Sequence, residues 1–275
     1  MAAIGVSPMG GANGVSYSEL ALPLVQFRTT LKPKATPAYP VPLQTVEPQR
    51  LYRQIADQLR GLIGKGEFDV GARIPAERDL AKQLGVSRPS VREALIALEV
   101  EGWVEIRTGS GVYVLDRSHR TNAPTTGIEW GPLEIIRARR LVEGETAATA
   151  AQHGKRKDVD AMRRAIQMMR ELAARSEPPH EGDRAFHLAI VNACSNVVLT
   201  ETVQGFWDSR HGPIFTRMID YFETMGSWHA AIGEHEAILD AIAARDPAAA
   251  REAMHTHMDK FHQRFSASWR RAKAS

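Results

Sequence analysis

The 275-residue sequence contains a single cysteine, Cys194, so it cannot form an intramolecular disulfide, and a reducing compartment is its natural setting. No apolar run approaches the roughly 18 residues that are needed to cross a bilayer. The N-terminus lacks the basic-then-apolar order of a secretory signal. These absences exclude a disulfide scaffold and disfavour membrane insertion and secretion, and they predict a cytoplasmic protein.

Signatures of common enzymes are also missing. The sequence has no Gly-rich phosphate-binding loop, and position 239 after His235-Glu236 is a leucine, so the HExxH protease motif is absent. The net charge of +3 is mildly basic, which is compatible with a nucleic-acid partner without requiring one. A hydrophobic fraction of 43% supplies core for two domains of ordinary size.

The chain divides into four regions by composition and periodicity. Residues 1–45 are rich in Gly, Pro, Ser and Thr without a sustained period, which predicts a disordered arm. Residues 46–116 are expected to form one domain, the polar stretch 117–127 a linker, and residues 128–275 an all-helical domain of about six helices. The helix breaks in this last domain are predicted at Gly154, Ser176–Pro179, Ser195–Asn196, Gly212–Pro213, Gly226–Ser227 and Asp246–Pro247.

The domain at 46–116 shows three helical patterns followed by two short β-prone runs. The helices are predicted over 50–63, from Pro75 to Gly85, and from an N-cap at Ser87 to Gly102. The β-prone runs, 104–106 and 112–115, flank a Gly-containing turn. This order predicts a winged helix-turn-helix, and hence a mainly α protein with one small β-hairpin wing and a helical-bundle second domain.

The third predicted helix carries a pattern that suits DNA recognition. Arg88 and Arg92 are four residues apart in its first two turns, so they share a face where a helix in the major groove meets base edges. Arginine can donate two hydrogen bonds to guanine, and the serines near the helix start suit phosphates. A solvated helix face is the alternative interpretation. The candidate DNA-binding residues are Arg78, Ser87, Arg88, Ser90, Arg92 and Gly109.

Four residues of the second domain have the chemistry of metal ligands. Asp183 and His187 lie four apart, and His235 and His257 fall on the apolar sides of later helices, whereas His255 is expected to face outward. Three imidazoles and one carboxylate suit Zn²⁺, Ni²⁺, Mn²⁺ or Fe²⁺. Hydrogen-bonded helix histidines are the alternative, because periodicity cannot show convergence. Cys194 is expected to be a small buried residue rather than a ligand.

The first domain resembles the winged-helix domain of the GntR family of transcription regulators. The matching motifs are P-A-E-R-x-L-A at 75–81, G-V-S-R-x-x-V-R-E-A-L at 85–95, G-W-V at 102–104 and G-S-G at 109–111. The resemblance implies DNA contacts at the six candidate positions. Pro89 stands where many members carry threonine, so one phosphate or base contact is expected to be missing. A single winged helix contacts one half-site, so we expect a homodimer on a palindromic operator.

Residues 132–265 resemble the FadR-type C-terminal domain of GntR regulators. The local contexts D-R-A-F-H, E-H-E-A-I-L-D-A-I and A-M-H-T-H-M agree with the metal-binding members of that group. The resemblance implies that Asp183, His187, His235 and His257 hold a divalent metal, with zinc the first choice. It also implies that Arg139 and Asn196 bind an effector.

Within this family the stretches R-L-Y-R-Q-I-A and W-G-P-L-E-I-I-R-A-R-R-L-V-E look most like hexuronate-utilisation repressors. The resemblance implies a repressor whose operator affinity is controlled by a small carboxylate metabolite, a hexuronate or a related sugar acid. Three rival functions stay open. The effector could be lactate, pyruvate or an amino acid, the metal itself could be the signal, or the protein could be a metal-dependent hydrolase.

Overall fold

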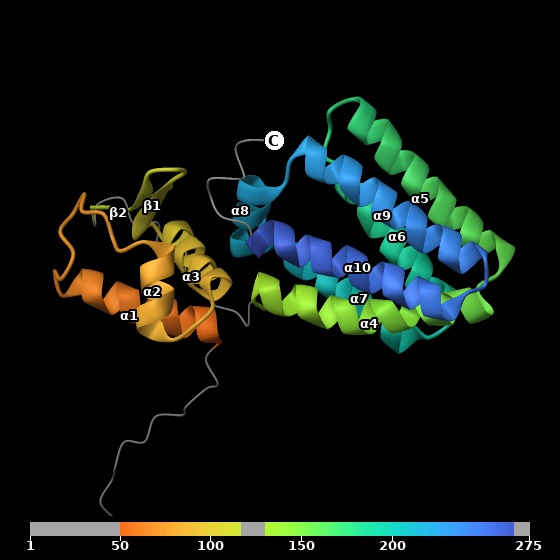
Figure 1. Cartoon of the computed structure of the whole chain (residues 1–275), viewed down its shortest axis with the longest axis horizontal. Helices are drawn as coiled ribbons and strands as arrows, with labels where there is room; N and C mark the ends of the chain where they lie inside the picture. The colour runs from red at the N-terminus through yellow and green to blue at the C-terminus, as the bar shows by residue number, and fades with distance from the viewer. Residues whose placement is uncertain (1–49, 117–129, 267–275) are drawn as a thin grey trace, which may run out of the picture. The chain divides into compact units, whose positions relative to one another are not determined.

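The computed structural model describes residues 50–116 and 130–266, so the predicted arm 1–45 and linker 117–127 lie outside the described residues (Figure 1). The first domain consists of α1 (Leu51–Gly64), α2 (Glu77–Leu84), α3 (Arg88–Val100), β1 (Val104–Arg107) and β2 (Gly111–Val114). The second consists of α4 (Pro132–His153), α5 (Arg156–Ala174), α6 (His180–Ala193), α7 (Val197–Asp208), the 3₁₀ segment η2 (Ser209–His211), α8 (Pro213–Phe222), α9 (Met225–Ala243) and α10 (Pro247–Ser266). The predicted mainly α fold with a hairpin wing is confirmed.

Local sequence signals place the helices of the first domain. Gly85 ends α2 in the left-handed conformation, with φ of +66°, which glycine adopts without steric cost. Ser87 begins α3 by accepting a hydrogen bond from the backbone N–H of Ser90. The start predicted for the second helix is two residues too early, because Ala76 still has extended backbone and Pro75 precedes it.

The wing is a two-stranded antiparallel hairpin. Val104 pairs with Val114 and Arg107 pairs with Gly111. Alternate side chains of both strands, Val104 and Ile106 on one and Val112 and Val114 on the other, are buried, as the period of two requires for a half-buried hairpin. The hairpin therefore closes over the helices with one face and leaves its turn exposed.

In the second domain α4 and α10 run side by side, while α6 packs against both α4 and α5 (Figure 1). The described residues there form seven α-helices, one more than the number predicted. The break predicted at Gly226–Ser227 lies three residues earlier, at Glu223–Thr224, because α9 already starts at Met225, where Thr224 caps it by accepting a bond from the Ser227 backbone N–H. The apolar side chains that these helices bury include Met162, Met169, Phe186, Ile190, Ile238 and Met254.

No helix among residues 50–116 and 130–266 is both long and apolar enough to cross a membrane.

Candidate functional site

Four polar side chains from three helices meet in the interior of the second domain. Asp183 and His187 lie one turn apart on α6, His235 is on α9 and His257 is on α10, and all four are buried. One donor atom from each lies within 4.8 Å of the others. Residues spaced four apart share a helix face, which explains how α6 contributes two donors. The structure thus brings together the four residues that the sequence singled out.

The spacing of the donor atoms tests whether a metal fits. His187 Nε2 lies 3.2 Å from His235 Nε2 and 3.4 Å from Asp183 Oδ1. His235 Nε2 lies 3.2 Å from the same Asp183 oxygen. Ligands that each sit about 2.1 Å from one ion, at tetrahedral to octahedral angles, are about 3.0 to 3.4 Å apart. The donor set therefore fits one divalent transition-metal ion.

Carboxylates behind two of the histidines orient the rings. His257 Nδ1 lies 2.8 Å from Glu234 Oε2, and His187 Nδ1 contacts Glu143 Oε2. An ionised carboxylate only accepts, so the bond to Glu234 selects the His257 tautomer with hydrogen on Nδ1 and leaves its Nε2 lone pair for a ligand role. Carboxylate–histidine pairs of this kind are typical of metal sites.

The charge states of the cluster also suit coordination. Burial, with His235 beside it, lowers the pKa of His257 to about 3, so that ring is neutral. Burial favours the acid form of Asp183, but bonds with His187 and His235 hold its pKa well below the usual range. At His187 burial opposes the imidazolium, yet Glu143 and Asp183 raise the pKa. Burial also lowers the pKa of His235, so a metal meets one carboxylate anion and two neutral rings, and competes with a proton at His187.

Arg139 on α4 lies beside this cluster and is 1% exposed. Its Nε donates to Glu143 Oε1 at 2.5 Å, and its guanidinium carbon lies 4.5 Å from the centre of the Trp207 ring. Burial opposes ionisation of Glu143, but Arg139 and His187 hold its pKa at about 2. Glu143 thus links the arginine to a candidate ligand histidine.

Arg210, in η2, is a second buried arginine at the site. Its Nη1 donates to Asp183 Oδ2 at 3.1 Å, and its Nη2 lies 3.5 Å from Glu223 Oε1. The outer oxygen of Asp183 is fixed in this way, while Oδ1 faces the histidines. Burial raises the pKa of Glu223 to about 7. Arg210 therefore joins a candidate metal ligand to a carboxyl group that has no role in the metal cluster.

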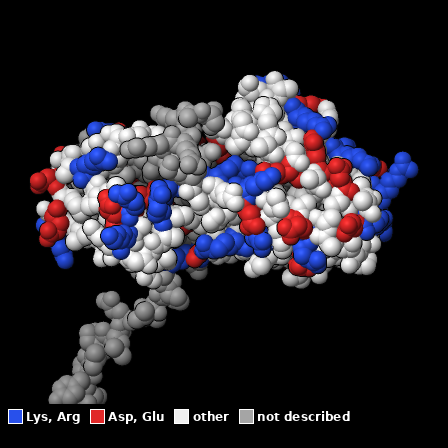
Figure 2. All heavy atoms as spheres, viewed as in Figure 1, with Lys and Arg blue, Asp and Glu red and all other residues white. Residues whose placement is uncertain are grey.

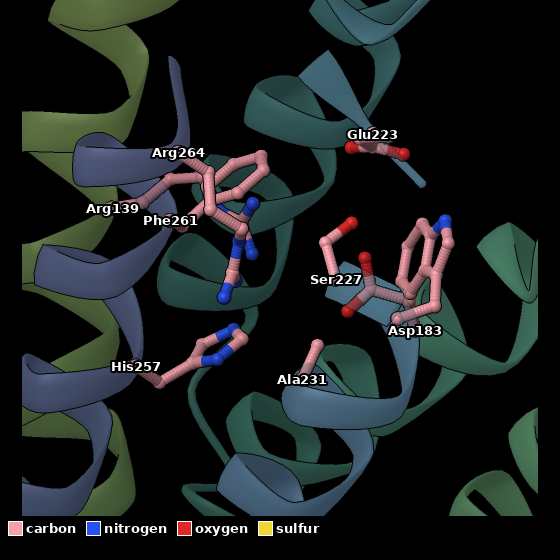
Figure 3. A pocket seen from close by; sticks show the side chains of 9 residues that line it. Arg139, Asp183, Glu223, Ser227, Ala231, His257, Phe261 and Arg264 are labelled. Atoms are coloured by element: carbon pink, nitrogen blue, oxygen red, sulfur yellow. The ribbon is translucent and has the colours of Figure 1, made fainter. Parts of the chain in front are cut away.

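A small cavity adjoins the cluster (Figure 3). Its lining includes Arg139, Asp183, Glu223, His257, Phe261 and Arg264. The cavity volume is about 20 Å³, which is room for about one water molecule. Two candidate metal ligands and the arginine predicted to bind effector therefore share one cavity, whose present volume is too small for an organic acid.

Asn196 does not line this cavity. Its side chain is exposed, and its Oδ1 accepts hydrogen bonds from the backbone N–H groups of Val198 and Leu199 at the start of α7. Asn196 caps α7, because its short polar side chain satisfies the first N–H groups of the helix, and the effector contact predicted for it stays a prediction.

His255 and Cys194 both lie outside the cluster of four candidate ligands. His255 is half-buried against Gly144 of α4 rather than fully outward, and it lies outside the four-residue cluster. Cys194 Sγ donates to the backbone oxygen of Thr146 at 3.3 Å, and burial raises the pKa of its thiol to about 11. Neither residue supplies a donor to the cluster.

The first domain carries the candidate DNA-binding surface. A cleft of about 430 Å³ lies between α2, α3 and the hairpin, and four arginines line it: Arg73, Arg78, Arg88 and Arg107. Gly109 in the hairpin turn, at φ of +80°, lines the same cleft. Ser87 is exposed and Ser90 half-buried at the start of α3. Figure 2 shows basic side chains gathered over α2 on the face drawn there.

Arg92 does not join this surface. It is fully buried, and its Nε and Nη2 donate to the two carboxylate oxygens of Glu77 at 2.9 and 2.7 Å. Arg88, whose side chain is 51% exposed, donates to Glu77 Oε1 at 3.0 Å. The exposed position expected for Arg92 is wrong, because its guanidinium donates to Glu77 on the preceding helix and, at 2.7 Å, to the backbone oxygen of Phe265 on α10. Arg88 remains available to a groove while Arg92 holds α2 to α3.

Helix α3 also contacts α8. Arg217 Nε donates to Glu99 Oε2 at 2.9 Å, and the Tyr221 hydroxyl lies 2.8 Å from the same carboxylate. Helix α8 ends one residue before Glu223, which lines the cavity. The cavity wall and α3 are therefore joined by one short helix.

Comparison with known proteins places the chain in a family. The model of bacterial regulatory proteins of the gntR family matches residues 51–114, and the FCD domain model matches residues 134–260. The sequence is 38% identical to the Uxu operon transcriptional regulator of Escherichia coli (strain K12), over 78% of this chain and 87% of that protein. The chain belongs to the GntR family.

This GntR-family chain has further relatives of similar extent. It is 35% identical to the Exu regulon transcriptional regulator of Escherichia coli (strain K12), over 79% of this chain and 85% of that protein. It is 34% identical to the putative L-lactate dehydrogenase operon regulatory protein of the same strain, over 79% and 87%. Among solved structures, Streptococcus agalactiae GntR is similar at 22% identity and a TM-score of 0.41, covering 77% of this chain and 99% of that one.

Membership in the GntR family assigns the first domain to DNA binding and the chain to transcription regulators, which are not enzymes. The alternative of a metal-dependent hydrolase is thereby excluded.

The sequence analysis did not identify three charged residues that lie beside the cluster: Glu143, Arg210 and Glu223. Glu143 had a usable signal, since it follows Arg139 by four residues on a helix. Arg210 and Glu223 had none, because their partners lie on other helices.

Proposed function

We propose that this regulator is a cytoplasmic, metal-dependent repressor that releases its operator when a small carboxylate binds beside the metal. The observation that carries the proposal is the convergence of Asp183, His187, His235 and His257 on one point, with the cavity and Arg139 next to it. Zinc suits this donor set best, followed by Ni²⁺, Mn²⁺ and Fe²⁺. The bound ion supplies open coordination positions that a carboxylate oxygen can occupy.

The charges around the cavity favour an anion once a divalent ion is present. Around the site the ionisable groups other than histidine are Arg139, Arg210, Arg264, Lys260, Glu143, Asp183, Glu223 and Glu234. Three guanidinium groups and one ammonium balance four carboxylates, and a divalent ion then adds two positive charges. Metal loading and acid binding are therefore expected to be coupled, because the site gains a net positive charge only when it holds the ion.

Arg139 is suited to hold the second oxygen of the effector carboxylate. A planar guanidinium pairs with a carboxylate through parallel hydrogen bonds. The bond to Glu143 and the stacking on Trp207 hold the group in place, which lowers the entropy that binding costs.

The names of relatives guide the choice of acid. The resemblance to hexuronate-utilisation repressors, together with relatives named for the Uxu operon and the Exu regulon, favours glucuronate, galacturonate or a derived sugar acid. A relative named for an L-lactate dehydrogenase operon makes L-lactate the second candidate.

For DNA, we propose a homodimer on a palindromic operator, because one winged helix reads one half-site and two linked sites multiply affinity. The proposed contacts are Arg78, Ser87, Arg88, Ser90 and Gly109. Effector binding shifts the equilibrium only if the acid fits the state of low DNA affinity better. The bonds of Glu99 with Arg217 and Tyr221 offer a route from the cavity to α3.

Calorimetric titration of zinc, and then of acids into the zinc-loaded protein, tests the site. We expect His257→Ala to weaken both zinc and acid binding, Arg139→Ala to weaken acid binding alone, and His255→Ala to change neither. Thermal unfolding of each variant controls for packing, since His255 lies against Gly144. Full zinc retention in His257→Ala would disprove the ligand assignment. The acid panel contains D-glucuronate, D-galacturonate, L-lactate and pyruvate.

A further inference from the structure

Glu223 occupies an unusual position in the cavity. It is the residue that follows α8, its side chain is 9% exposed, and its carboxylate faces the cavity (Figure 3). Oxygen Oε1 lies 3.5 Å from Arg210 Nη2. Oxygen Oε2 is buried and has no hydrogen-bond partner among the described residues, and His180 Nδ1, at 3.9 Å, is beyond hydrogen-bond reach.

A buried carboxylate oxygen without a donor is costly, so such atoms in native proteins generally meet a water or a ligand. The metal cluster does not include Glu223, and no role in DNA binding reaches it. Oε2 is therefore an acceptor that the protein's own described groups do not satisfy, and it lines the cavity proposed for the effector.

Two chemical groups of a metabolite could donate to Glu223: a hydroxyl or an ammonium. The charge of the metal-loaded site is +2 with Glu223 already counted as an anion, so an ammonium would enter a site that repels it. Arg210 also offsets the charge of Glu223 through Oε1. A hydroxyl is neutral, so the positive charge of the site does not repel it, and it can still donate a hydrogen bond to Oε2.

We propose that Glu223 accepts hydrogen bonds from hydroxyl groups of the effector, and so selects polyhydroxylated carboxylic acids over simple acids of the same size. The inference rests on the proposed function, since it assumes that the acid binds beside the metal. In Figure 3, Glu223 and His257 lie on opposite sides of the cavity. The acid's carboxylate therefore belongs at the metal ligands and Arg139, and its hydroxyls belong at Glu223.

The cavity of about 20 Å³ has to widen for such a ligand. Glu223 and Thr224 form the joint between α8 and α9, so a ligand that bonds Glu223 acts directly on the end of α8. Glu223 would thus both select hydroxylated acids and transmit their binding to α8.

The test uses the full-length, zinc-loaded protein and two acids that share a ring and a carboxylate. D-glucuronate carries ring hydroxyls, whereas tetrahydropyran-2-carboxylate carries none. The wild type is expected to prefer D-glucuronate by at least about tenfold, because a site built to accept from hydroxyls rejects an analogue that lacks them. Glu223→Gln is expected to weaken D-glucuronate about tenfold and leave the dissociation constant of the hydroxyl-free acid within about twofold.

Comparing the dissociation constants of the two acids distinguishes a loss of selectivity from a structural defect, because a structural defect would weaken the binding of both acids equally. Glu223→Asp keeps the charge and is expected to retain part of the preference. Glu177→Gln, an exposed glutamate paired with Arg175, is the matched control. Equal binding of both acids by the wild type, an unchanged constant for D-glucuronate in Glu223→Gln, or tighter binding of an amino acid such as L-serine overturns the inference. If the wild type binds no acid in the presence of zinc, the proposed function itself fails.

Discussion

His257 Nδ1 and Glu234 Oε2 lie 2.8 Å apart in the interior of the second domain, where the carboxylate fixes the tautomer of the ring. Burial opposes ionisation of Glu234, but His257 and Arg264 hold its pKa at about 2, so the group is an anion at every pH of physiological interest. The pair orients the Nε2 atom of His257 and increases its basicity.

Replacing the Glu234 carboxylate should therefore weaken metal binding. We expect Glu234→Gln to lower zinc affinity about 10- to 100-fold in a chelator competition assay, the range usual for groups that support a ligand. Glu236→Gln, two positions along the same helix and exposed in its pair with Arg170, is expected to leave zinc affinity unchanged. Equal zinc affinity in the two variants would remove Glu234 from the site.

The pKa of Glu223 predicts a pH-dependent cost to folding. Its folded value of about 7 is above the ordinary 4.5, so the folded state binds the extra proton between these values. The cost of burying the anion is absent below pH 4.5, grows as pH rises, and is complete above pH 7, at roughly 3 kcal/mol. Glu223→Gln should therefore stabilise the metal-free protein against urea at pH 8 and have little effect at pH 5. A gain of equal size at both pH values would contradict this.

Arg88 and Arg92 should behave differently although they share a helix. Arg88→Ala removes an exposed guanidinium and is expected to reduce operator affinity by about 1–3 kcal/mol with little change in stability. Arg92→Ala leaves Glu77 without its bidentate buried partner and is expected to cost about 3–5 kcal/mol of folding free energy. Gel-shift titrations and urea unfolding measure the two quantities, and Arg175→Ala in the second domain is the control.

The thiol of Cys194 should be unreactive. Burial raises its pKa to about 11, two units above its ordinary value of 9.0, so the thiolate is about 100-fold scarcer at neutral pH. Alkylation by iodoacetamide at pH 7.5 is therefore expected to be at least about 100-fold slower in the folded protein than in guanidinium chloride. Similar rates in both conditions would show that the thiol is open to solvent.

The sequence predicted correctly those features of the fold that depend on residues close together in the chain. The cap at Ser87 and the helix end at Gly85 were predicted from single positions, because the backbone geometry there depends on residues within one turn. Helical periodicity also placed His187, His235 and His257 on inward faces, although only the resemblance indicated that they converge.

The rest depended on contacts between elements distant in the sequence. Arg92 is buried because Glu77, fifteen residues earlier, accepts from it, and nothing in the spacing of α3 reveals that partner. Arg210 holds Asp183 from 27 residues away. The sequence analysis did not predict that Asn196 caps α7.

The narrowness of the cavity has a consequence for timing. A site that holds about one water molecule admits an organic acid only during excursions to a wider conformation. The observed association rate should then level off at high acid concentration, at the rate at which the wider form appears, instead of rising without limit. The apparent affinity is reduced by the fraction of molecules in that form. The delay between the arrival of the metabolite and the release of the operator would be set by the protein rather than by diffusion.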